Sequence, residues 1–516
     1  MKRTLFFVGP WDLNRELPCV PREANEGRVL LVESEAKGSA LPYHRQKLVL
    51  VLSAMHHFAK ELRADGYTAR VTRAESYVAA LRAEIEITKA ERVVALRPRE
   101  WGLERALEAA RDSLGAPLEL FDDGGEGSHF LLSREEFRAW ADGKRQLRMH
   151  DFYVWMRKRT GYLMDGNQPI GGQWSFDAKN RQHARGTQPP RVPRHTPDPL
   201  TQQIMKRVAR WPNHWGSVEG FGWPVTRAAA IEELDHFFQF RAESFGRYQD
   251  AMLQGEAFLW HSLISPSINL SLLSPREVCE RIQLEFTRGS LPIESAEGLL
   301  RQVLGWREFI RGIYWRRMPE LRTANLLGAT RPLPDFFWEP EKTDLECLRQ
   351  SVGHVRDHGY AHHIQRLMVQ GNFALLAGVD PLQISHWFWA AFVDAYEWVE
   401  LPNVVGMAVY ADDTFTTKPY AASGNYIAKM SDYCKSCPYD VKQRSGPEAC
   451  PYNSLFWSFM QRHRARLSQN PRLAVLYKSW DKLPQDEQRA TLSTAERFLA
   501  ALQPPEAAWS FDDDAC

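Results

Sequence analysis

The sequence has no apolar run that approaches the roughly 18 residues needed for a membrane-spanning helix. Its longest helix-like apolar block, residues 48–55, is interrupted by Ser53 and flanked by charge. The N-terminus, MKRTLFFVGPWDL, begins with basic residues, but its apolar stretch is too short for a secretory signal peptide. These absences argue against a membrane or secreted protein, and we predict a cytoplasmic one.

A GxGxxG motif and a phosphate-binding loop are also absent, so dinucleotide binding by the first part of the chain is not supported. This part nevertheless alternates strand-like and helix-like segments. The expected strands are residues 4–8, 28–32, 68–71, 92–96 and 118–121, and the expected helices are residues 44–63 and 102–114. Such repetition predicts a doubly wound parallel α/β sheet, which binds ligands at the carboxyl ends of its strands.

Strand-like segments are lacking after Gly220, where apolar residues recur with helical spacing. Residues of about 140–215 differ from both parts, because they are rich in Gly, Pro, Arg and Gln. We expect them to form a long connection without core elements. The predicted organisation is an α/β domain at residues 1–130, an interdomain linker with a basic loop at 131–220, and an all-helical domain at 221–516.

The chain has almost no net charge, with 65 basic and 64 acidic residues. The basic residues are unevenly placed, because residues 141–210 contain 14 Lys and Arg against 5 acidic residues. A basic block beside a neutral body favours an anionic partner. A solvated, mobile loop would have the same composition, so charge alone leaves both interpretations open.

Cysteine is scarce, with seven residues, but three of them lie close together near the C-terminus. Cys434 and Cys437 form a CxxC motif, and Cys450 follows after twelve residues. Cys347 is the best candidate for a fourth ligand because it lies in the same helical region. Four thiolates can hold zinc or an iron–sulfur cluster. One CxxC, one lone cysteine and one remote cysteine favour a [4Fe–4S] cluster, with zinc as the alternative and redox CxxC chemistry as a weaker one.

Six long stretches of idiosyncratic sequence are spread over two thirds of the chain. They are residues 152–181, 245–273, 305–315, 360–376, 394–406 and 417–450. These stretches, which include FYVWMRKRTGYL and YAHHIQRLMVQGNFALL, resemble the iron–sulfur bacterial cryptochromes and prokaryotic (6-4) photolyases of the photolyase/cryptochrome family. The resemblance implies an N-terminal α/β antenna domain and a C-terminal helical domain that binds FAD. The four cluster cysteines of the family fall on Cys347, Cys434, Cys437 and Cys450.

The resemblance also implies a set of residues that hold the FAD. They are Gly246, Gln249, Ser262, Leu263, Ser265, Asn269, Trp306, Arg307, Asp394 and Glu400. The first six form a small polar patch suited to a diphosphate, although the residues alone would equally suit an ordinary helix–helix connection. Asp394 would hold the ribityl or ring N3–H side of the flavin. Glu400 would face flavin N5, and its alternative role is that of a surface acid at a helix terminus.

A lesion site follows from the same resemblance. His363 would donate a proton to the photolesion with His362 in support, and an imidazole suits this task because its pKa lies near the working pH. From the residues alone, each histidine could equally be a polar core or surface residue. Gln302 and Tyr420 are implied contacts to a lesion swung out of the duplex. The basic residues expected to grip DNA phosphates are Arg157, Arg159, Lys179 and Arg181.

Tryptophan is abundant, with 18 residues, which suits aromatic packing of helices and also electron relay. By resemblance, Trp387 is nearest the flavin in a relay, with Trp338 and Tyr396 as further stops. Relatives commonly have Tyr at the position of Phe388. Phenylalanine has no phenolic proton to lose on oxidation, so Trp389 is a candidate substitute.

The family branch carries 6,7-dimethyl-8-ribityllumazine as an antenna pigment, and the implied site lies in the first domain. The segment VGPWDL at residues 8–13 departs from the LGDQL pattern of relatives, and Asp12 is the candidate for its acidic residue. Glu33, Tyr43 and His44 match the relatives better. We therefore expect a lumazine antenna at this site.

Three functions are compatible with the sequence. The first is light-driven repair of (6-4) pyrimidine–pyrimidone photoproducts in UV-damaged DNA, by electron transfer from reduced FAD. The second is a blue-light photoreceptor, a cryptochrome with the same chromophores, and the third is a flavin–iron–sulfur oxidoreductase without photochemistry. The paired histidines and the basic linker favour repair, by a protein that we expect to be a monomer.

Overall fold

The computed structural model describes residues 3–125, 127–184 and 186–505, and its first part contains a five-stranded sheet in the order β3-β2-β1-β4-β5. The strands are β1 (Thr4–Phe7), β2 (Gly27–Ser34), β3 (Thr68–Ala74), β4 (Arg92–Leu96) and β5 (Leu118–Phe121). All neighbouring strands are parallel, and Phe6 on the central strand lies opposite Val29 on β2 and Val94 on β4. The predicted parallel α/β sheet is confirmed.

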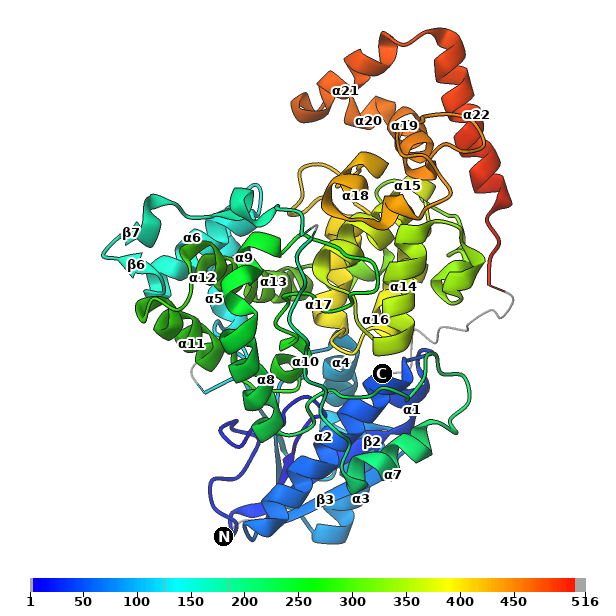
Figure 1. Cartoon of the computed structure of the whole chain (residues 1–516). Coiled ribbons are helices and arrows are strands. Elements are labelled where there is room, and N and C mark those ends of the chain that lie inside the picture. The colour runs from blue at the N-terminus through cyan, green and yellow to red at the C-terminus, as the bar shows by residue number, and fades with distance from the viewer. Residues whose placement is uncertain (1–2, 126, 185, 506–516) are drawn as a thin grey trace.

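The helices around the sheet begin and end where local sequence signals place them. They are α1 (Glu35–Ser39), α2 (Arg45–Ala64), α3 (Tyr77–Thr88) and α4 (Trp101–Ala110). The His44 ring accepts a hydrogen bond from the backbone N–H of Gln46 and thereby caps α2. Val49, Leu52 and Met55 lie on the buried stripe of this helix. In Figure 1 this α/β part forms the lower end of the molecule, below a larger helical body.

The segment predicted as a connection contains a buried helix. Its elements are α5 (Arg134–Ala141), α6 (Met149–Thr160), the short strands β6 (Met164–Asp165) and β7 (Gln168–Pro169), and α7 (Pro199–Val208). Phe152 and Tyr153 of α6 are fully buried in the core. The expectation of a connection without core elements is therefore wrong for α6. The apolar residues of this helix were not recognised as a core face because basic residues lie between and beside them in the sequence. The exact domain boundaries stay a prediction.

The rest of the described chain is helical, as predicted, and no strand follows β7 in residues 170–184 and 186–505. Figure 1 shows the last three helices projecting from the end of the body opposite the sheet. None of the helices in the described ranges is long and apolar enough to cross a bilayer. The α-helices are α8 (Arg227–Phe240), α9 (Ala242–Tyr248), α10 (Ser265–Asn269), α11 (Pro275–Thr287), α12 (Ile293–Leu300), α13 (Glu308–Arg317), α14 (Glu346–His358), α15 (Asn372–Ala377), α16 (Pro381–Ala391), α17 (Glu397–Pro402), α18 (Gly424–Met430), α19 (Pro451–Arg462), α20 (Arg464–Leu467), α21 (Pro471–Asp481) and α22 (Gln485–Ala501).

Three π-helical segments interrupt the helical body. They are η4 (Arg301–Arg307), η8 (Gln365–Gly371) and η9 (Asn403–Ala408). A Cβ on Gly371 would lie 2.8 Å from the Cβ of Ala408, so only glycine lets η8 and η9 approach this closely. Wide helical turns of this kind are rare and occur frequently at functional sites. Their grouping marks the part of the body where a site is expected.

A buried guanidinium joins the sheet to the helical body. Arg99 follows β4, is 1% exposed, and donates hydrogen bonds to the backbone oxygens of Trp11 and Asn269 at 2.8 Å each. It also donates to Ser271 Oγ at 2.8 Å and forms an ion pair with Asp12 at 2.5 Å. Trp11 and Asp12 follow β1, whereas Asn269 and Ser271 belong to the end of α10 and the loop after it. One side chain therefore satisfies polar groups from both halves of the protein.

Replacement of Arg99 by methionine is expected to lower the free energy of unfolding by about 3–5 kcal/mol, because it leaves a buried ion-pair partner and two carbonyls unsatisfied. Urea denaturation followed by circular dichroism measures this change. The control is Arg70→Met, whose side chain is 53% exposed in its ion pair with Glu84 and should cost about 1 kcal/mol or less. Equal costs for the two variants would contradict the joining role of Arg99.

Candidate functional site

The helical body encloses a cavity of about 340 Å³. Residues from all three π-helical segments, α10 and α17 line it, and Phe245, Trp398 and Met407 provide apolar walls. The predicted cofactor residues on its wall are Gln249, Ser262, Ser265, Asn269, Trp306, Arg307, Asp394 and Glu400. A large concave site with a few convergent polar groups among apolar walls is typical of a cofactor site.

Asp394 anchors the polar side of this cavity. Its two carboxylate oxygens each accept a 3.0 Å hydrogen bond from the guanidinium of Arg366, and Ser265 Oγ donates another at 2.7 Å. Asn269 Nδ2 donates to the backbone oxygen of Asp394 at 2.8 Å. Burial alone would raise the pKa of Asp394, but Arg366 and Ser265 outweigh it and leave this pKa below its usual value. Asp394 is therefore a fixed negative charge at neutral pH.

Glu400 has the opposite character. It is buried, and neither of its carboxyl oxygens has a hydrogen-bond partner in the described part of the chain. Burial raises the pKa of Glu400 well above its usual value, and the charge of Lys47 offsets only part of this effect. Burial thus favours the protonated form, which can donate one hydrogen bond. The alternative of a surface acid is excluded by its burial, and its unpaired oxygens are suited to a ligand in the cavity.

Two of the predicted cofactor residues, Gly246 and Leu263, are not part of the cavity wall. A Cβ on Gly246 would lie 2.5 Å from the backbone nitrogen of Ser295, and the Gly246 N–H donates to Ser295 Oγ at 2.9 Å. This glycine lets α9 pack closely on α12. Leu263 is buried with a positive φ of 60°. Both residues shape the backbone beside the cavity, and their contact with a diphosphate stays a prediction.

Three histidines line the same cavity. His362 is buried and stacks on His261 with ring centroids 4.5 Å apart and planes 15° from parallel. Within the described residues, both ring nitrogens of His362 and Nε2 of His261 have no partner. Burial lowers the pKa of His261 to about 3 and that of His362 well below its usual value. The sequence did not single out His261, although its neighbour Ser262 belongs to the predicted cofactor site.

His363 lines the cavity and is exposed to solvent through it. The surrounding protein still removes enough water to lower the pKa of His363 to about 4, and Arg366 contributes to the decrease. The imidazole is therefore neutral at pH 7 when the cavity holds no ligand. This corrects the expectation of a pKa near the working pH, because that expectation neglected desolvation and the neighbouring guanidinium.

Arg157 is wrongly predicted as a DNA contact. Its side chain is fully buried and donates hydrogen bonds to the backbone oxygens of Tyr162, Leu163 and Trp174. It stabilises the loop that follows α6. Arg157, Lys158 and Arg159 follow one another in α6, but the helical turn directs the first of them inward.

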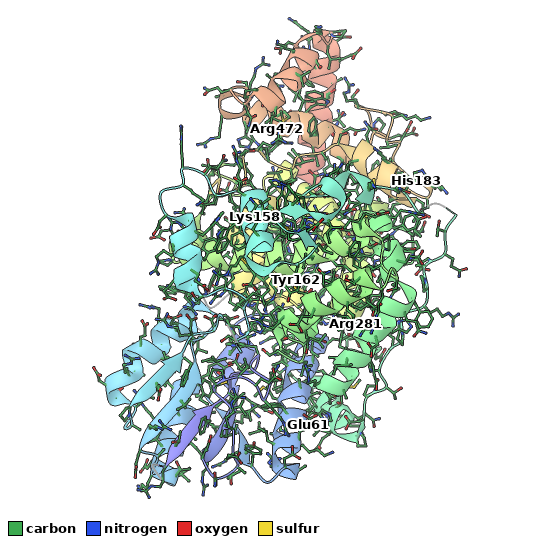
Figure 2. The ribbon with its side chains drawn as sticks, turned by 90° about the vertical axis from the view of Figure 1, so that its left-hand side faces the viewer. Glu61, Lys158, Tyr162, His183, Arg281 and Arg472 are labelled. Carbon is green, nitrogen blue, oxygen red and sulfur yellow. The ribbon has the colours of Figure 1, made fainter. Side chains whose placement is uncertain are left out.

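The other predicted phosphate contacts are exposed. Arg159 pairs with Glu136, Arg181 pairs with Asp177, and the Lys179 ammonium lies 5.2 Å from the ring centroid of Phe176. Figure 2 shows labelled basic side chains of the helical half, namely Lys158, His183 and Arg472.

The two predicted lesion contacts lie in different surroundings. Gln302 is half-buried and lines the cavity, as expected for a residue that meets a ligand there. Tyr420 is 39% exposed, outside the cavity wall. Contact of either side chain with a lesion stays a prediction.

Trp387 lies directly behind the cavity wall. It is fully buried, its Nε1 donates to the backbone oxygen of Phe337 at 2.8 Å, and its ring centroid lies 5.1 Å from that of Phe388. Phe388 itself lines the cavity. Trp338 is also buried, whereas Tyr396 lines a second cavity. The order of a relay through these residues stays a prediction.

The second cavity, of about 430 Å³, opens at the carboxyl ends of β1 and β2. Glu33 and Tyr43 line it, as predicted for the antenna site. Glu33 accepts hydrogen bonds from His56 at 2.7 Å and Arg207 at 2.8 Å. Burial would raise the pKa of Glu33, but these two partners hold it below its usual value. The cavity therefore has a fixed carboxylate on its wall.

Asp12 and His44 do not line the second cavity. Asp12 is the counterion of Arg99, and His44 is fully buried with its Nε2 donating to the backbone oxygen of Arg356 at 2.8 Å. Contact of Asp12 or His44 with an antenna pigment stays a prediction. Both are polar residues near the expected site, and sequence position alone does not distinguish a structural partner from a ligand contact.

One short segment separates the two cavities. Asp394 and Ala395 line the first cavity, and the next residue, Tyr396, lines the second. Lys47 lines the second cavity, and its ammonium donates to the backbone oxygen of Ala395 at 2.5 Å. Burial lowers the pKa of Lys47 to about 7, although carboxylates including Asp394 oppose the decrease. Residues 394–396 therefore form a wall that both cavities share, and Lys47 contacts this wall from the second cavity.

The four cysteines that the sequence groups together line one small cavity of about 10 Å³, beside Gly424 and Tyr452. Burial raises the pKa of the Cys347 thiol well above its usual value, and the other three thiols raise it further. A Cβ on Gly424 would lie 2.8 Å from Cys450 Sγ, so glycine leaves room for that sulfur. Among the described residues, no three His, Cys, Asp or Glu side chains are placed to hold a single metal ion.

Comparisons with known proteins place these features in context. The sequence model for deoxyribodipyrimidine photo-lyase-related proteins matches residues 6–223. The curated (6-4) photolyase of Agrobacterium fabrum (strain C58) is 42% identical over 489 residues, which are 93% of this chain and 96% of that protein. This chain belongs to the (6-4) photolyase branch of the photolyase/cryptochrome family. Members of this family bind FAD.

Two solved structures share the photolyase fold. A bacterial class III photolyase from Agrobacterium tumefaciens matches with a TM-score of 0.59 and 15% identity, over 83% of this chain and 86% of that one. The cryptochrome of Synechocystis sp. PCC6803 matches with a TM-score of 0.56 and 14% identity, over 100% and 97% of the two chains. At these identities the likeness concerns the fold.

Asp394→Asn is expected to weaken FAD binding by roughly tenfold to a hundredfold, or about 1.4–2.8 kcal/mol. The amide keeps the shape but loses the charge that holds Arg366 and an acceptor for the cofactor. Equilibrium dialysis of the apoprotein with FAD gives the dissociation constant. The control is Asp481→Asn, which alters a surface ion pair with Arg464. Unchanged FAD affinity in Asp394→Asn would remove Asp394 from the cofactor site.

Proposed function

We propose that this protein repairs (6-4) pyrimidine–pyrimidone photoproducts in DNA by light-driven electron transfer from FAD. The observation that carries the proposal is the exposure of His363 into the cavity that also contains Asp394 and Glu400. This arrangement puts a proton-transfer group in reach of any molecule that enters beside the cofactor. The 42% identical (6-4) photolyase of A. fabrum supports the same substrate class.

The first cavity is suited to FAD. Asp394 is a charged acceptor for the ribityl or ring N–H side, and neutral Glu400 offers a donor to a ring nitrogen. Trp306 and Trp398 supply aromatic walls, and Arg307 supplies a positive charge. When bound in its reduced form, FAD supplies the electron on absorption of blue light. The protein residues position it and exclude water.

His363 is the residue that moves the proton. Its pKa of about 4 makes it a poor proton donor before DNA binds. A DNA phosphate brought near the ring favours the imidazolium and raises this pKa toward neutrality. Neutral, buried His362 stacks on His261 behind it and limits the positions that the neighbouring backbone can take. His363 thus becomes protonated, and able to act as an acid, only when DNA is bound.

DNA binding is the proposed role of the exposed basic residues of the linker, Arg159, Lys179 and Arg181. Their charges are sequence-independent contacts to phosphates. The lesion is swung out of the duplex to reach the cavity, with Gln302 on the cavity wall and Tyr420 at the surface as its proposed contacts.

The four-cysteine cavity is the proposed site of a [4Fe–4S] cluster. A single zinc ion needs its thiolate sulfurs within about 4 Å of one another, since each lies about 2.3 Å from the metal. The lack of such a group among the described residues is compatible with a cluster, in which each thiolate binds a different iron. All four cysteines line one small cavity, and Gly424 permits the close approach of Cys450 Sγ to its backbone. We assign the cluster a structural role.

The second cavity is the proposed antenna site for 6,7-dimethyl-8-ribityllumazine. Tyr43 and Trp389 offer aromatic faces, and Glu33 and Lys47 offer charged partners for a polar heterocycle. Its position at the carboxyl ends of parallel strands agrees with the usual place of ligands in such sheets.

Repair is tested with a single-stranded oligonucleotide that contains one (6-4) photoproduct. Reduced protein under blue light is expected to restore the two intact pyrimidines, and the dark reaction is expected to leave the lesion unchanged. Chromatography of the digested oligonucleotide measures the restored bases. Bound and photoreducible FAD without repair would contradict the proposal and favour a photoreceptor.

His363→Asn is expected to lower the repair rate by about 100- to 10,000-fold, as removal of a general acid does, without changing FAD content. In the parent, kcat/KM should rise as the pH falls from 8 toward 6, because a pKa of about 4 in the free enzyme leaves less imidazolium at higher pH. The variant should lose this dependence. The control is His463→Asn, since His463 also has a pKa of about 4 but lies outside the cavity. Full repair by His363→Asn would contradict the role of His363 as the proton donor.

Cys434→Ala is expected to remove most iron and acid-labile sulfide from the purified protein, because one cluster ligand is lost. The control is Cys279→Ala, which changes a buried cysteine outside the four-cysteine cavity and should leave the metal content unaltered. Elemental analysis measures both. Zinc in place of iron, or unchanged iron in Cys434→Ala, would overturn the cluster proposal.

A further inference from the structure

Trp387 connects the first cavity with aromatic residues outside it. Its ring meets Phe388 of the cavity wall on one side. On another side its centroid lies 6.5 Å from that of Trp215, with the planes inclined at 56°. An electron that leaves Trp387 toward the cavity can thus be replaced from a neighbouring indole in van der Waals reach.

Trp215 also contacts Trp338. Their centroids are 5.6 Å apart in an edge-to-face arrangement at 88°, and Trp215 Nε1 donates to the backbone oxygen of Trp338 at 2.9 Å. Trp387, Trp215 and Trp338 therefore form a continuous series of indoles. Phenylalanines also surround Trp387, but their rings are much harder to oxidise than an indole, so Trp215 is the neighbour suited to pass a charge.

The surroundings of Trp215 hold its ring in one position. Its backbone N–H donates to the Tyr43 oxygen at 3.2 Å, and its backbone oxygen accepts from the Arg45 N–H at 2.8 Å. His44 packs edge-on against the indole at 5.5 Å, and a Cβ on Gly216 would lie 2.2 Å from the His44 ring. Burial lowers the pKa of His44 to about 4, so this neighbour adds no positive charge beside the indole at neutral pH. The rigid contact therefore holds the Trp215 indole at a fixed distance from Trp387.

We propose that Trp215 is an electron-transfer residue that links Trp387 to Trp338 during photoreduction of the cofactor. Trp387 gives one electron toward the cavity, Trp215 gives one to the oxidised Trp387, and Trp338 gives one to the oxidised Trp215. No bond forms or breaks in these transfers, and the acceptor of the first electron would be the oxidised flavin proposed for the first cavity. A thiolate from solution returns one electron to the oxidised Trp338 and becomes a thiyl radical. The inference rests on the proposed flavin photochemistry, and it adds a residue from the linker segment to the relay.

The test is Trp215→Phe in the FAD-loaded protein with dithiothreitol as the thiol. Photoreduction under blue light is expected to slow roughly tenfold, which corresponds to about 1.4 kcal/mol of barrier. Electron paramagnetic resonance after a flash should show a smaller yield of long-lived tryptophan radical. Repair by protein that is reduced chemically with dithionite should stay unchanged, because that route does not use the relay. The matched control is Trp140→Phe, an indole with 7% exposure against 8% for Trp215 and equally packed among aromatic rings.

Each outcome has a distinct meaning. Photoreduction of Trp215→Phe at the parental rate, with the parental radical yield, would overturn the role of Trp215 even if Trp387→Phe is slow. A parent protein that binds FAD without photoreduction would instead contradict the proposed function. If Trp215→Phe fails to fold, Trp215→Tyr tests the same step, because the phenol fills the site but requires a proton acceptor on oxidation. Photoreduction of Trp215→Tyr at the parental rate, with no tyrosyl radical, would also overturn the proposal.

Discussion

The placement of both large cavities depends on one buried ion pair, between Arg99 and Asp12. Arg99 reaches from the end of β4 into the helical body and satisfies oxygens of Trp11 and Asn269 at once. Trp11 belongs to the wall of the second cavity and Asn269 to that of the first. A guanidinium is suited to this task because its five N–H donors lie in a rigid plane. One side chain thus contacts a wall residue of each cavity.

Burial decides the charge of the groups in the first cavity more than residue type does. Asp394 stays ionised because Arg366 compensates its desolvation, whereas Glu400 without a close partner becomes a neutral acid. His363 is accessible from the cavity, but desolvation and the charge of Arg366 lower its pKa to about 4 and leave the imidazole neutral. Two carboxyl groups therefore serve as an acceptor and a donor within one cavity, a division that arises from their environments.

Patterns of spacing predicted the parallel sheet and the helical body, since these depend on local apolar periodicity. The grouping of four cysteines was also visible, because Cys434 and Cys437 lie close in sequence. The burial of Arg157 could not be predicted from the sequence, because a basic residue gives no signal of which backbone oxygens surround it. The contacts of Asp12 with Arg99 and of His44 with the backbone oxygen of Arg356 were not visible either, because these partners lie far away in the sequence. His261 and Trp215 contact residues of the first cavity only through tertiary structure. Such contacts leave no pattern in the sequence, so neither residue could be predicted.

The segment of Asp394, Ala395 and Tyr396 has a consequence for how such proteins diverge. Consecutive residues face opposite cavities, and Lys47 holds the Ala395 oxygen from the far side. A substitution that adapts one cavity to a different ligand therefore moves the backbone that shapes the other. A change of ligand in one cavity is thus constrained by the fit of the other, so the two specificities should change together or remain fixed.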